Sequence, residues 1–194
     1  MSDGDAPASG QGRGAAALLT AKPGHNRFAW DYRWSEGGPL VAPGTYTASL
    51  GGTSKTFEVV VDPGVLRDGL TAADLLEQQN FLLSVRDAQS EAVRLRARIQ
   101  NAMQKAGVTL PPAPGPGEWV QRGKYSHPLQ ELWARVVTAP GTYQQGMLID
   151  QLSNIMRAEG GADQKVGVES RRRLDDLVKE MKAIDVELRT IAGL

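Results

Sequence analysis

The sequence predicts an α+β fold in which a small, incomplete antiparallel β-sandwich is followed by an antiparallel helical bundle. Residues 24–64 alternate apolar and polar side chains with a period of two, which is typical of half-buried strands. From residue 65 to residue 194, apolar residues recur every three or four positions, the period of a helix that buries one face. The 194 residues suffice for one domain of ordinary size or two small ones.

Residues 1–23 are expected to form a disordered leader. Gly, Ala, Ser, Asp and Pro dominate this stretch, so little apolar surface could offset the entropy lost on ordering. Residues 15–20 (AAALLT) are the only part with enough apolar content for a short strand.

A first strand is predicted over residues 26–34. Alternation along this segment places four aromatic residues on one face and charged residues on the other. Four aromatics on one face are most often part of a sandwich core, but they could also stack on sugars. The aromatic residues of this face are Phe28, Trp30, Tyr32 and Trp34.

Two further strands are predicted over residues 45–50 and 55–61, joined by a hairpin loop at 51–54. An Asp-Pro-Gly sequence at 62–64 ends the sheet, because proline cannot donate a hydrogen bond to a ladder. The residues of the last strand that face inward are Phe57, Val59 and Val61.

A long helix is predicted over residues 71–105. Thr71 is a favourable N-cap, and Asp74 lies at the position where a capping-box carboxylate belongs. Gly107 ends the helix. Its apolar stripe consists of Leu75, Leu82, Val85, Ala92, Leu95, Ile99 and Ala102.

Three shorter segments complete the helical region. Residues 108–124 are rich in proline and predict an extended connection along the surface. Helices are expected over 128–137 and 142–158, and a reversal at 159–162 leads into a last helix over 163–191. That helix carries a heptad seam, and helices joined by short loops pack antiparallel. The seam residues are Leu174, Leu177, Met181, Ile184, Leu188 and Ile191.

Composition disfavours several classes of function. Lys plus Arg equals Asp plus Glu, 22 each, so no net charge attracts nucleic acid. The chain has no cysteine, which excludes disulfides and thiolate chemistry. No apolar run approaches the roughly 18 residues of a transmembrane helix, and no signal peptide begins the chain as given. A cytoplasmic protein, a mature form and a fragment of a longer protein all fit.

We find no residues in a pattern that predicts catalysis, and expect the chain not to be an enzyme. The carboxylate pair Asp175 and Asp176 falls between seam positions, among basic residues, which indicates a solvated helix face with ion pairs. His25 and His127 lack a second ligand at metal-binding spacing. The sequence contains no phosphate-binding GxxxxGK[ST] loop and no GxGxxG motif that joins a strand to a helix. It also contains no GxSxG motif of the kind that carries a nucleophilic serine. We therefore predict no catalytic residues, no cofactor and no metal.

The segment GHNRFAWDYR at 24–33, followed by PGTYT at 43–47, resembles a motif of an Ig-like β-sandwich. This sandwich occurs near the carboxyl end of secreted bacterial proteins built on a sortilin-type, sialidase (BNR)-repeat β-propeller, where a helical hairpin follows it. A similar pattern occurs in the Ig-like domain of the flagellar hook-capping protein. The propeller is absent here, so none of its catalytic residues carries over. The resemblance implies an extracytoplasmic location, periplasmic or secreted.

The leading functional hypothesis is a non-catalytic structural or interaction module, the tail or a subunit of an extracytoplasmic assembly. Its partner would be a protein, either an upstream propeller or another subunit. An Ig-like sandwich uses about seven strands and only three are readable here. Either the long helix from Thr71 folds back over Phe28, Trp30, Phe57 and Val59, or a strand from a partner or a missing upstream segment completes the sheet, and we favour the second. The alternatives are a carbohydrate-related accessory domain and an extrinsic subunit peripherally associated with a membrane complex. The candidate interaction surface comprises Phe28, Trp30, Tyr32, Trp34, Tyr46, Trp119 and Trp133.

Overall fold

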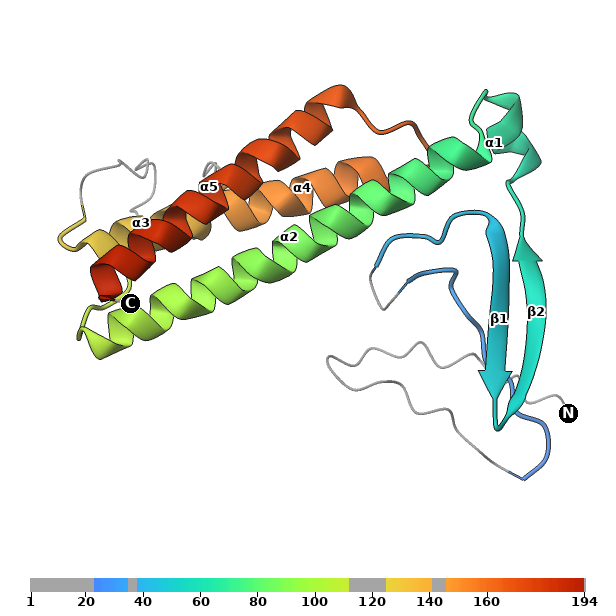
Figure 1. Ribbon diagram of the computed structural model, residues 1–194, viewed down its shortest axis with the longest axis horizontal. Coiled ribbons are helices and arrows are strands. Elements are labelled where there is room, and N and C mark those ends of the chain that lie inside the picture. The colour runs from blue at the N-terminus through green and yellow to red at the C-terminus, as the bar shows by residue number, and fades with distance from the viewer. Residues whose placement is uncertain (1–22, 35–37, 112–124, 141–145, 194) are drawn as a thin grey trace, which may run out of the picture. The chain divides into compact units, whose positions relative to one another are not determined.

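The computed structural model describes residues 23–34, 38–111, 125–140 and 146–193 (Figure 1). Contacts divide the chain into two units, Met1–Tyr32 and Arg33–Leu194. Within the described residues the second unit is a mixed α+β structure with a two-stranded antiparallel sheet and five helices. The expected leader and most of the proline-rich connection lie outside the described residues.

The first unit is described from residue 23 to residue 32, and the strand predicted there is not present. Tyr32 adopts a φ of +58°, in the left-handed region. A chain that turns at this residue cannot continue the extended alternation on which the prediction rested. Beyond it, the backbone of Arg33 forms an isolated bridge with Leu40 and no strand, and Trp34 N donates to Pro39 O at 3.1 Å. The aromatic alternation therefore corresponds to irregular backbone.

The sheet consists of β1 (Gly44–Leu50) and β2 (Thr53–Val59). These are the second and third strands expected from the sequence, with β2 beginning two residues earlier and ending two residues earlier than predicted. The β-sandwich is not confirmed, because the described residues contain no further strand to pair with β1 or β2. Val61, expected to face inward from the last strand, lies beyond the end of β2.

A short helix, α1 (Pro63–Arg67), follows the sheet where the sequence predicted only a strand terminator. Asp62 caps it, its Oδ1 accepting from Gly64 N at 2.6 Å. Proline occupies the first helical position, where its missing N–H costs nothing. The Asp-Pro-Gly sequence thus ends the sheet and begins a helical turn.

The long helix α2 (Ala72–Lys105) agrees closely with its prediction. Thr71 and Asp74 form the expected capping box: Asp74 N donates to Thr71 Oγ1 at 3.2 Å, and Thr71 N donates to Asp74 Oδ2 at 2.9 Å. Gly107, with a φ of +66°, follows the last turn in a conformation that favours glycine. The predicted stripe is buried except for Ala102, which is partly buried.

The remaining helices are α3 (Pro128–Val136), α4 (Leu148–Gly160) and α5 (Val168–Ala192). The start predicted for the third helix, at residue 142, lies outside the described residues. The reversal expected at 159–162 begins later, because α4 continues to Gly160 and the connection extends to Gly167. The last helix accordingly begins at Val168 rather than at 163.

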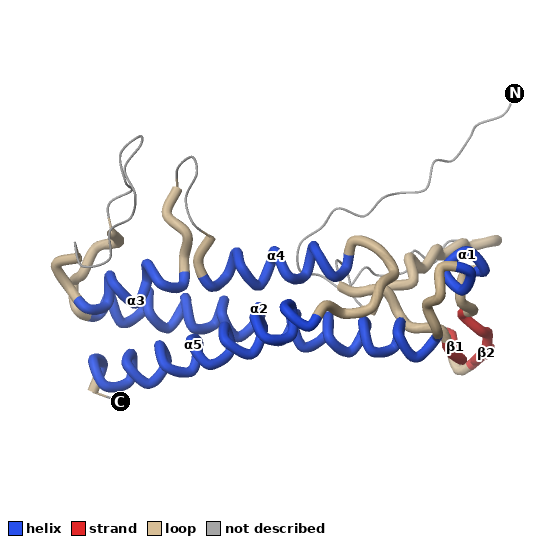
Figure 2. Tube along the Cα trace, turned by 90° about the horizontal axis from the view of Figure 1, so that it is seen from above, coloured by secondary structure: helices blue, strands red, loops and turns tan. Residues whose placement is uncertain are grey.

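Hydrogen bonds fix the directions of the helices. Glu77 on α2 pairs with Arg171 on α5, and Arg98 pairs with Asp185, so α2 and α5 run parallel. By contrast, α4 is antiparallel to α2, since Gln78 bonds to Glu159 and Gln89 to Ser153. Figures 1 and 2 show α3 and α4 following one another along α2. Together, α3 and α4 lead the chain back along α2 before α5 runs parallel to it, so an all-antiparallel bundle is not confirmed.

One apolar core lies between these four helices. The heptad seam of α5 contributes to it at every expected position but the last, because Ile191 is 39% exposed near the end of the helix. The largest of its fully buried side chains are Leu95, Ile99, Met103, Leu132, Leu148, Leu152, Leu177, Ile184, Val85 and Val136.

A buried polar clamp joins α2 to the connection between α4 and α5. Gln78 Nε2 donates to Glu159 O at 2.6 Å and to Ala162 O at 2.7 Å. The carboxylate of Glu159 in turn accepts from Ser170 Oγ and from Gln164 Nε2. The bond from Gln78 to Glu159 O satisfies a carbonyl group in the last turn of α4, which has no partner within that helix.

Candidate functional site

The hairpin of β1 and β2 turns through two glycines with positive φ. Gly51 has a φ of +56° and Gly52 one of +82°, the conformation that a type I′ turn requires at both positions. Leu50 and Thr53 flank this turn as partners, followed by Ser49 with Ser54 and Ala48 with Lys55. The turn therefore sets the register of the whole hairpin.

This register separates the side chains by chemistry. One face carries Tyr46, Ala48 and Leu50 of β1 beside Phe57 and Val59 of β2, with the rings of Tyr46 and Phe57 stacked at 6.2 Å. The opposite face carries Thr45, Thr47 and Ser49 with Ser54, Thr56 and Glu58. The first face is thus mainly apolar, with Thr53 and Lys55 of β2 as its polar members, and the other face is polar.

The hairpin residues are nevertheless largely exposed. Every residue of the two strands except Tyr46 and Val59 is classed as exposed, and Leu50 of the apolar face is 70% exposed. The helical core contains no residue of either strand. A two-stranded hairpin is marginal in water, and at least three strands or a covering element are needed for independent stability.

The alternation of hydrogen bonds identifies the backbone groups at each outer edge. Leu50 and Thr53 flank a two-residue turn as a bonded pair, so Leu50, Ala48, Tyr46 and Gly44 point their N–H and C=O groups towards β2. The outward backbone groups of β1 belong to Thr45, Thr47 and Ser49. On β2 they belong to Ser54, Thr56 and Glu58. Within the described residues no third strand lies beside either edge.

The hairpin is attached to α2 through Ala42, which precedes β1. Ala42 N donates to Gln79 Oε1, and Tyr46 Oη donates to Ala42 O at 2.6 Å. Ala42 is 4% exposed and Gln79 is also buried. The hydroxyl of Tyr46, expected to belong to an interaction surface, therefore has an internal structural role.

The residues of the predicted aromatic surface belong to different parts of the chain, and each part is described by itself. Phe28, Trp30 and Tyr32 lie in the first unit, where the rings of Trp30 and Tyr32 are 5.2 Å apart. Trp34 is exposed in the second unit, and Trp133 packs against the helical core. Trp119 lies outside the described residues. Trp133 is thus mainly a packing residue.

Of the groups considered for chemistry, His127 has a structural role and the paired carboxylates lie on an exposed helix face. His127 caps α3, its Nδ1 accepting from Leu129 N at 3.1 Å. Asp175 and Asp176 are exposed on α5, and Asp176 is 3.7 Å from Lys179. No group of three or more His, Asp or Glu side chains in the described part of the chain could hold a metal ion.

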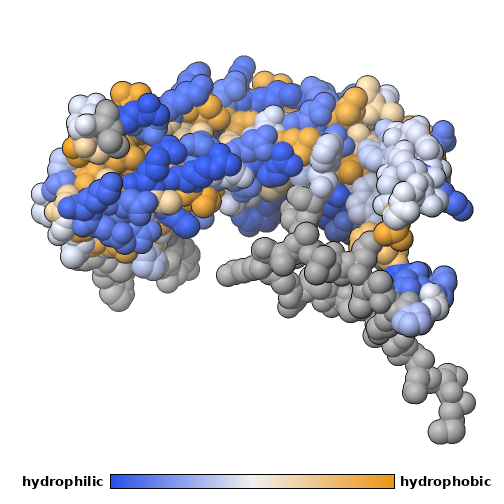
Figure 3. Space-filling view, turned by 60° about the horizontal axis from the view of Figure 1, so that its bottom comes forward, coloured by the Kyte–Doolittle hydropathy of each residue, from blue (hydrophilic) through white to orange (hydrophobic). Residues whose placement is uncertain are grey.

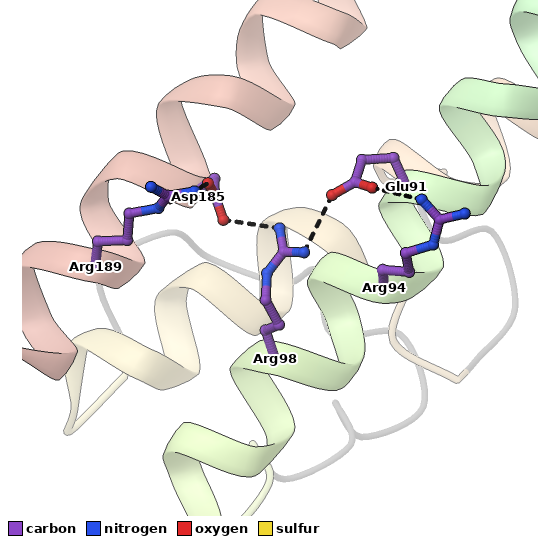
Figure 4. Close-up of polar contacts among 5 residues, drawn as sticks. All are labelled: Glu91, Arg94, Arg98, Asp185 and Arg189. Carbon is purple, nitrogen blue, oxygen red and sulfur yellow. Dashed lines mark hydrogen bonds and ion pairs between the residues drawn. The ribbon is translucent and has the colours of Figure 1, made fainter. Parts of the chain in front are cut away.

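Ion pairs line the contact between α2 and α5 (Figure 4). Arg98 donates to Glu91 at 3.1 Å on its own helix and to Asp185 at 2.7 Å on α5, and Arg189 also pairs with Asp185. Burial works to lower the pKa of Arg98, but its hydrogen bonds to Glu91 and Asp185 outweigh burial and raise the pKa. This network keeps α2 and α5 in register at the surface.

An open groove of about 730 Å³ lies between the amino-terminal halves of α2 and α5. Its apolar lining includes Leu76 and Phe81, but Arg171 lies over the ring of Phe81 at 5.7 Å and also pairs with Glu77. Figure 3 shows a mainly hydrophilic helical surface on which apolar residues form separate patches. The hairpin is therefore the stronger candidate for an interaction site.

Sequence reasoning did not single out Thr45, Thr47 and Ser49, or the buried glutamines Gln78 and Gln79. A signal for the first set was present, because β1 contains no charged residue and β2 contains Lys55 and Glu58. The glutamines gave no local signal, since their partners lie at least 37 positions away in the sequence.

Comparison with known proteins found no matching family model, no matching curated protein and no matching solved structure. None of the helices in the described residues combines the length and the apolar character needed to cross a membrane.

Proposed function

We propose that the chain is a non-catalytic interaction module that docks onto a protein partner through its β1–β2 hairpin. The observation that carries this proposal is the exposed hairpin with its mainly apolar face, beside whose two edges the described residues place no further strand. A partner that adds strands or covers the face would supply the stability that two strands lack. The packed helices, which we take to act as a helical bundle, then serve as the rigid support.

The finer architecture follows the same reasoning. The hairpin would be part of an Ig-like β-sandwich whose remaining strands come from another polypeptide. The motif resemblance at 24–33 and 43–47 supports this architecture and an extracytoplasmic assembly, with an upstream propeller or another subunit as the partner. The anchoring of β1 to α2 through Ala42 supports it further, because a fixed edge loses less entropy on docking than a free one.

The absence of catalysis is part of the proposal. Its support is that the described candidates are either capping groups, such as His127, or exposed carboxylates, such as Asp175. Turnover of a chromogenic glycoside or ester that disappeared in a single Asp or Glu variant would contradict this part.

Site-specific photocrosslinking tests the interaction. A benzophenone amino acid replaces Leu50 on the hairpin or, as a matched control, Val186 on α5, whose exposed fraction is 63% against 70% for Leu50. When the chain is expressed in its native host, position 50 should yield a discrete covalent adduct with a partner protein, and position 186 should not. No adduct from position 50, or equal labelling from both positions, would refute docking through the hairpin.

A carbohydrate-binding accessory domain is the second candidate. The observation that favours it is the exposure of Phe28, Tyr32 and Trp34, because exposed aromatic rings stack on sugars. Isothermal titration with a panel of oligosaccharides separates the two functions. Sugar binding that is lost in Trp34→Ala, with no adduct from position 50, would favour this second function over the first.

A further inference from the structure

The two edges of the hairpin differ in how they resist strand addition. β2 carries Lys55 on the apolar face and Glu58 on the polar face. A charged residue that points towards the side to be covered opposes edge-to-edge pairing, because pairing would bury it. β1, with the sequence GTYTASL, contains neither a charged residue nor a proline. Its edge is therefore the one that accepts another strand.

The strand that fits β1 can be derived from β1 itself. In an antiparallel pair, the residues that exchange hydrogen bonds point their N–H and C=O groups towards the other strand. The residues of β1 whose groups point away from β2, and so towards a new strand, are Thr45, Thr47 and Ser49. A two-fold axis at Thr47 brings all seven residues of two copies into register and pairs Thr45 with Ser49. On the apolar face, Tyr46 then lies opposite Ala48, and Leu50 lies opposite Gly44, so a large side chain meets a small one each time. No like charges face each other in this arrangement.

We propose that β1 pairs antiparallel with β1 of a second copy of this chain, forming a four-stranded sheet in the order β2-β1-β1-β2. The inference deepens the proposed function and rests on it, since it names the partner of the same hairpin. Four strands exceed the minimum for a stable sheet, and their shared face gathers Tyr46, Leu50 and Phe57 of both copies, with Lys55 on the outer strands. The outer edges are both β2, where Lys55 on the face to be covered opposes further addition, so the assembly stops at a closed dimer.

Proline substitutions at the two edges give a matched test. Thr47 and Thr56 are partners in the hairpin, and both direct their N–H groups away from the other strand. Proline at either position removes an N–H that the isolated hairpin does not use. Thr47→Pro removes two hydrogen bonds from the proposed dimer, one per copy, whereas Thr56→Pro removes none.

Sedimentation equilibrium of the full chain measures the dimer dissociation constant. Wild type should dimerise, Thr47→Pro should raise the constant about thirtyfold, and Thr56→Pro should change it by less than about twofold. Far-UV circular dichroism verifies that each variant folds. If Thr47→Pro disturbs the hairpin, Thr47→Lys provides the same test, because it places two like charges opposite each other at the axis, with Thr56→Lys as its control.

Three results would overturn the inference: a wild-type monomer at every concentration, equal weakening by Thr47→Pro and Thr56→Pro, or a dimer unaffected by both. The crosslinking experiment distinguishes this failure from failure of the proposed function. A monomeric chain whose position 50 crosslinks to a different protein keeps the hairpin as a docking site and excludes the second copy. A monomeric chain without any adduct contradicts both proposals.

Discussion

At the scale of single residues, apolar side chains that meet from several helices hold the structure together, and Ile184 is the most enclosed of them on α5. Its side chain is 0% exposed and lies in the core shared with α2, α3 and α4. The heptad pattern predicted this burial from spacing alone. The neighbour two positions later, Val186, has a similar shape but is 63% exposed, so it offers a direct comparison.

Replacing Ile184 with Asp should destabilise the fold by roughly 3 kcal/mol or more, because the carboxylate would be buried without a partner. Val186→Asp should change stability by no more than about 0.5 kcal/mol, as surface substitutions usually do. Chemical denaturation followed by circular dichroism measures both. Equal stability of the two variants would show that the seam of α5 does not pack in solution as it does in the structure.

At the scale of elements, the beginning of α2 depends on an ionised side chain. The side chain and the backbone N–H of Thr71 both donate to Asp74, and Lys165 lies 3.8 Å from it. The hydroxyl bond has the largest effect, followed by the backbone bond, and together they lower the pKa of Asp74 from its ordinary value of 3.8. The cap is thus complete only when Asp74 is charged.

The pH dependence follows from this shift. Because the pKa of Asp74 is lower in the folded than in the unfolded chain, its contribution is fully present above 3.8 and is lost as the pH falls through the folded-state pKa. Asp74→Asn should therefore flatten the decline in unfolding free energy as the pH falls below 3.8. Asp175→Asn, on the exposed face of α5, is the control. A decline as steep in Asp74→Asn as in wild type would contradict this assignment.

At the scale of the whole molecule, the helical core and the hairpin should differ in stability. The central part of α2 is buried on one face by three other helices, whereas the strands are exposed on both faces. Regions with few buried apolar contacts open at a lower free energy than the global transition. The hairpin is therefore expected to be the least stable regular element until it is paired.

Hydrogen exchange of the dilute chain measures this difference. The bonded amides of Tyr46, Ala48 and Leu50 should exchange at least about a hundredfold faster than those of α2 near Leu95 and Ile99, because a two-stranded sheet opens without global unfolding. Protection of the hairpin as strong as that of α2 in a monomer would mean that the hairpin is stable without a partner. Protection that grows at Thr47 as the concentration rises would instead agree with pairing of two copies.

The sequence by itself determined the features that depend on neighbouring residues. Thr71 and Asp74 predicted the start of α2, and spacing predicted most of the buried residues of α5. The glycine-rich sequence predicted a hairpin loop over 51–54, of which the turn uses only Gly51 and Gly52. Each of these interactions spans only a few positions, so the residues that decide it stand together in the sequence. The strand predicted over 26–34 shows the limit of this reasoning, because alternation does not reveal that Tyr32 turns the backbone.

Only the tertiary structure decided how these elements are combined. Gln79 reaches Ala42 across 37 positions and fixes the base of β1, and Gln78 reaches the end of α4 across 81. The parallel course of α2 and α5 also follows from the tandem arrangement of α3 and α4, which no periodicity encodes. Apolar patterning says that a face must be covered, but the partner that covers it depends on which distant segments meet. For this reason the hairpin's alternation predicted a core, whereas the fold leaves the hairpin exposed.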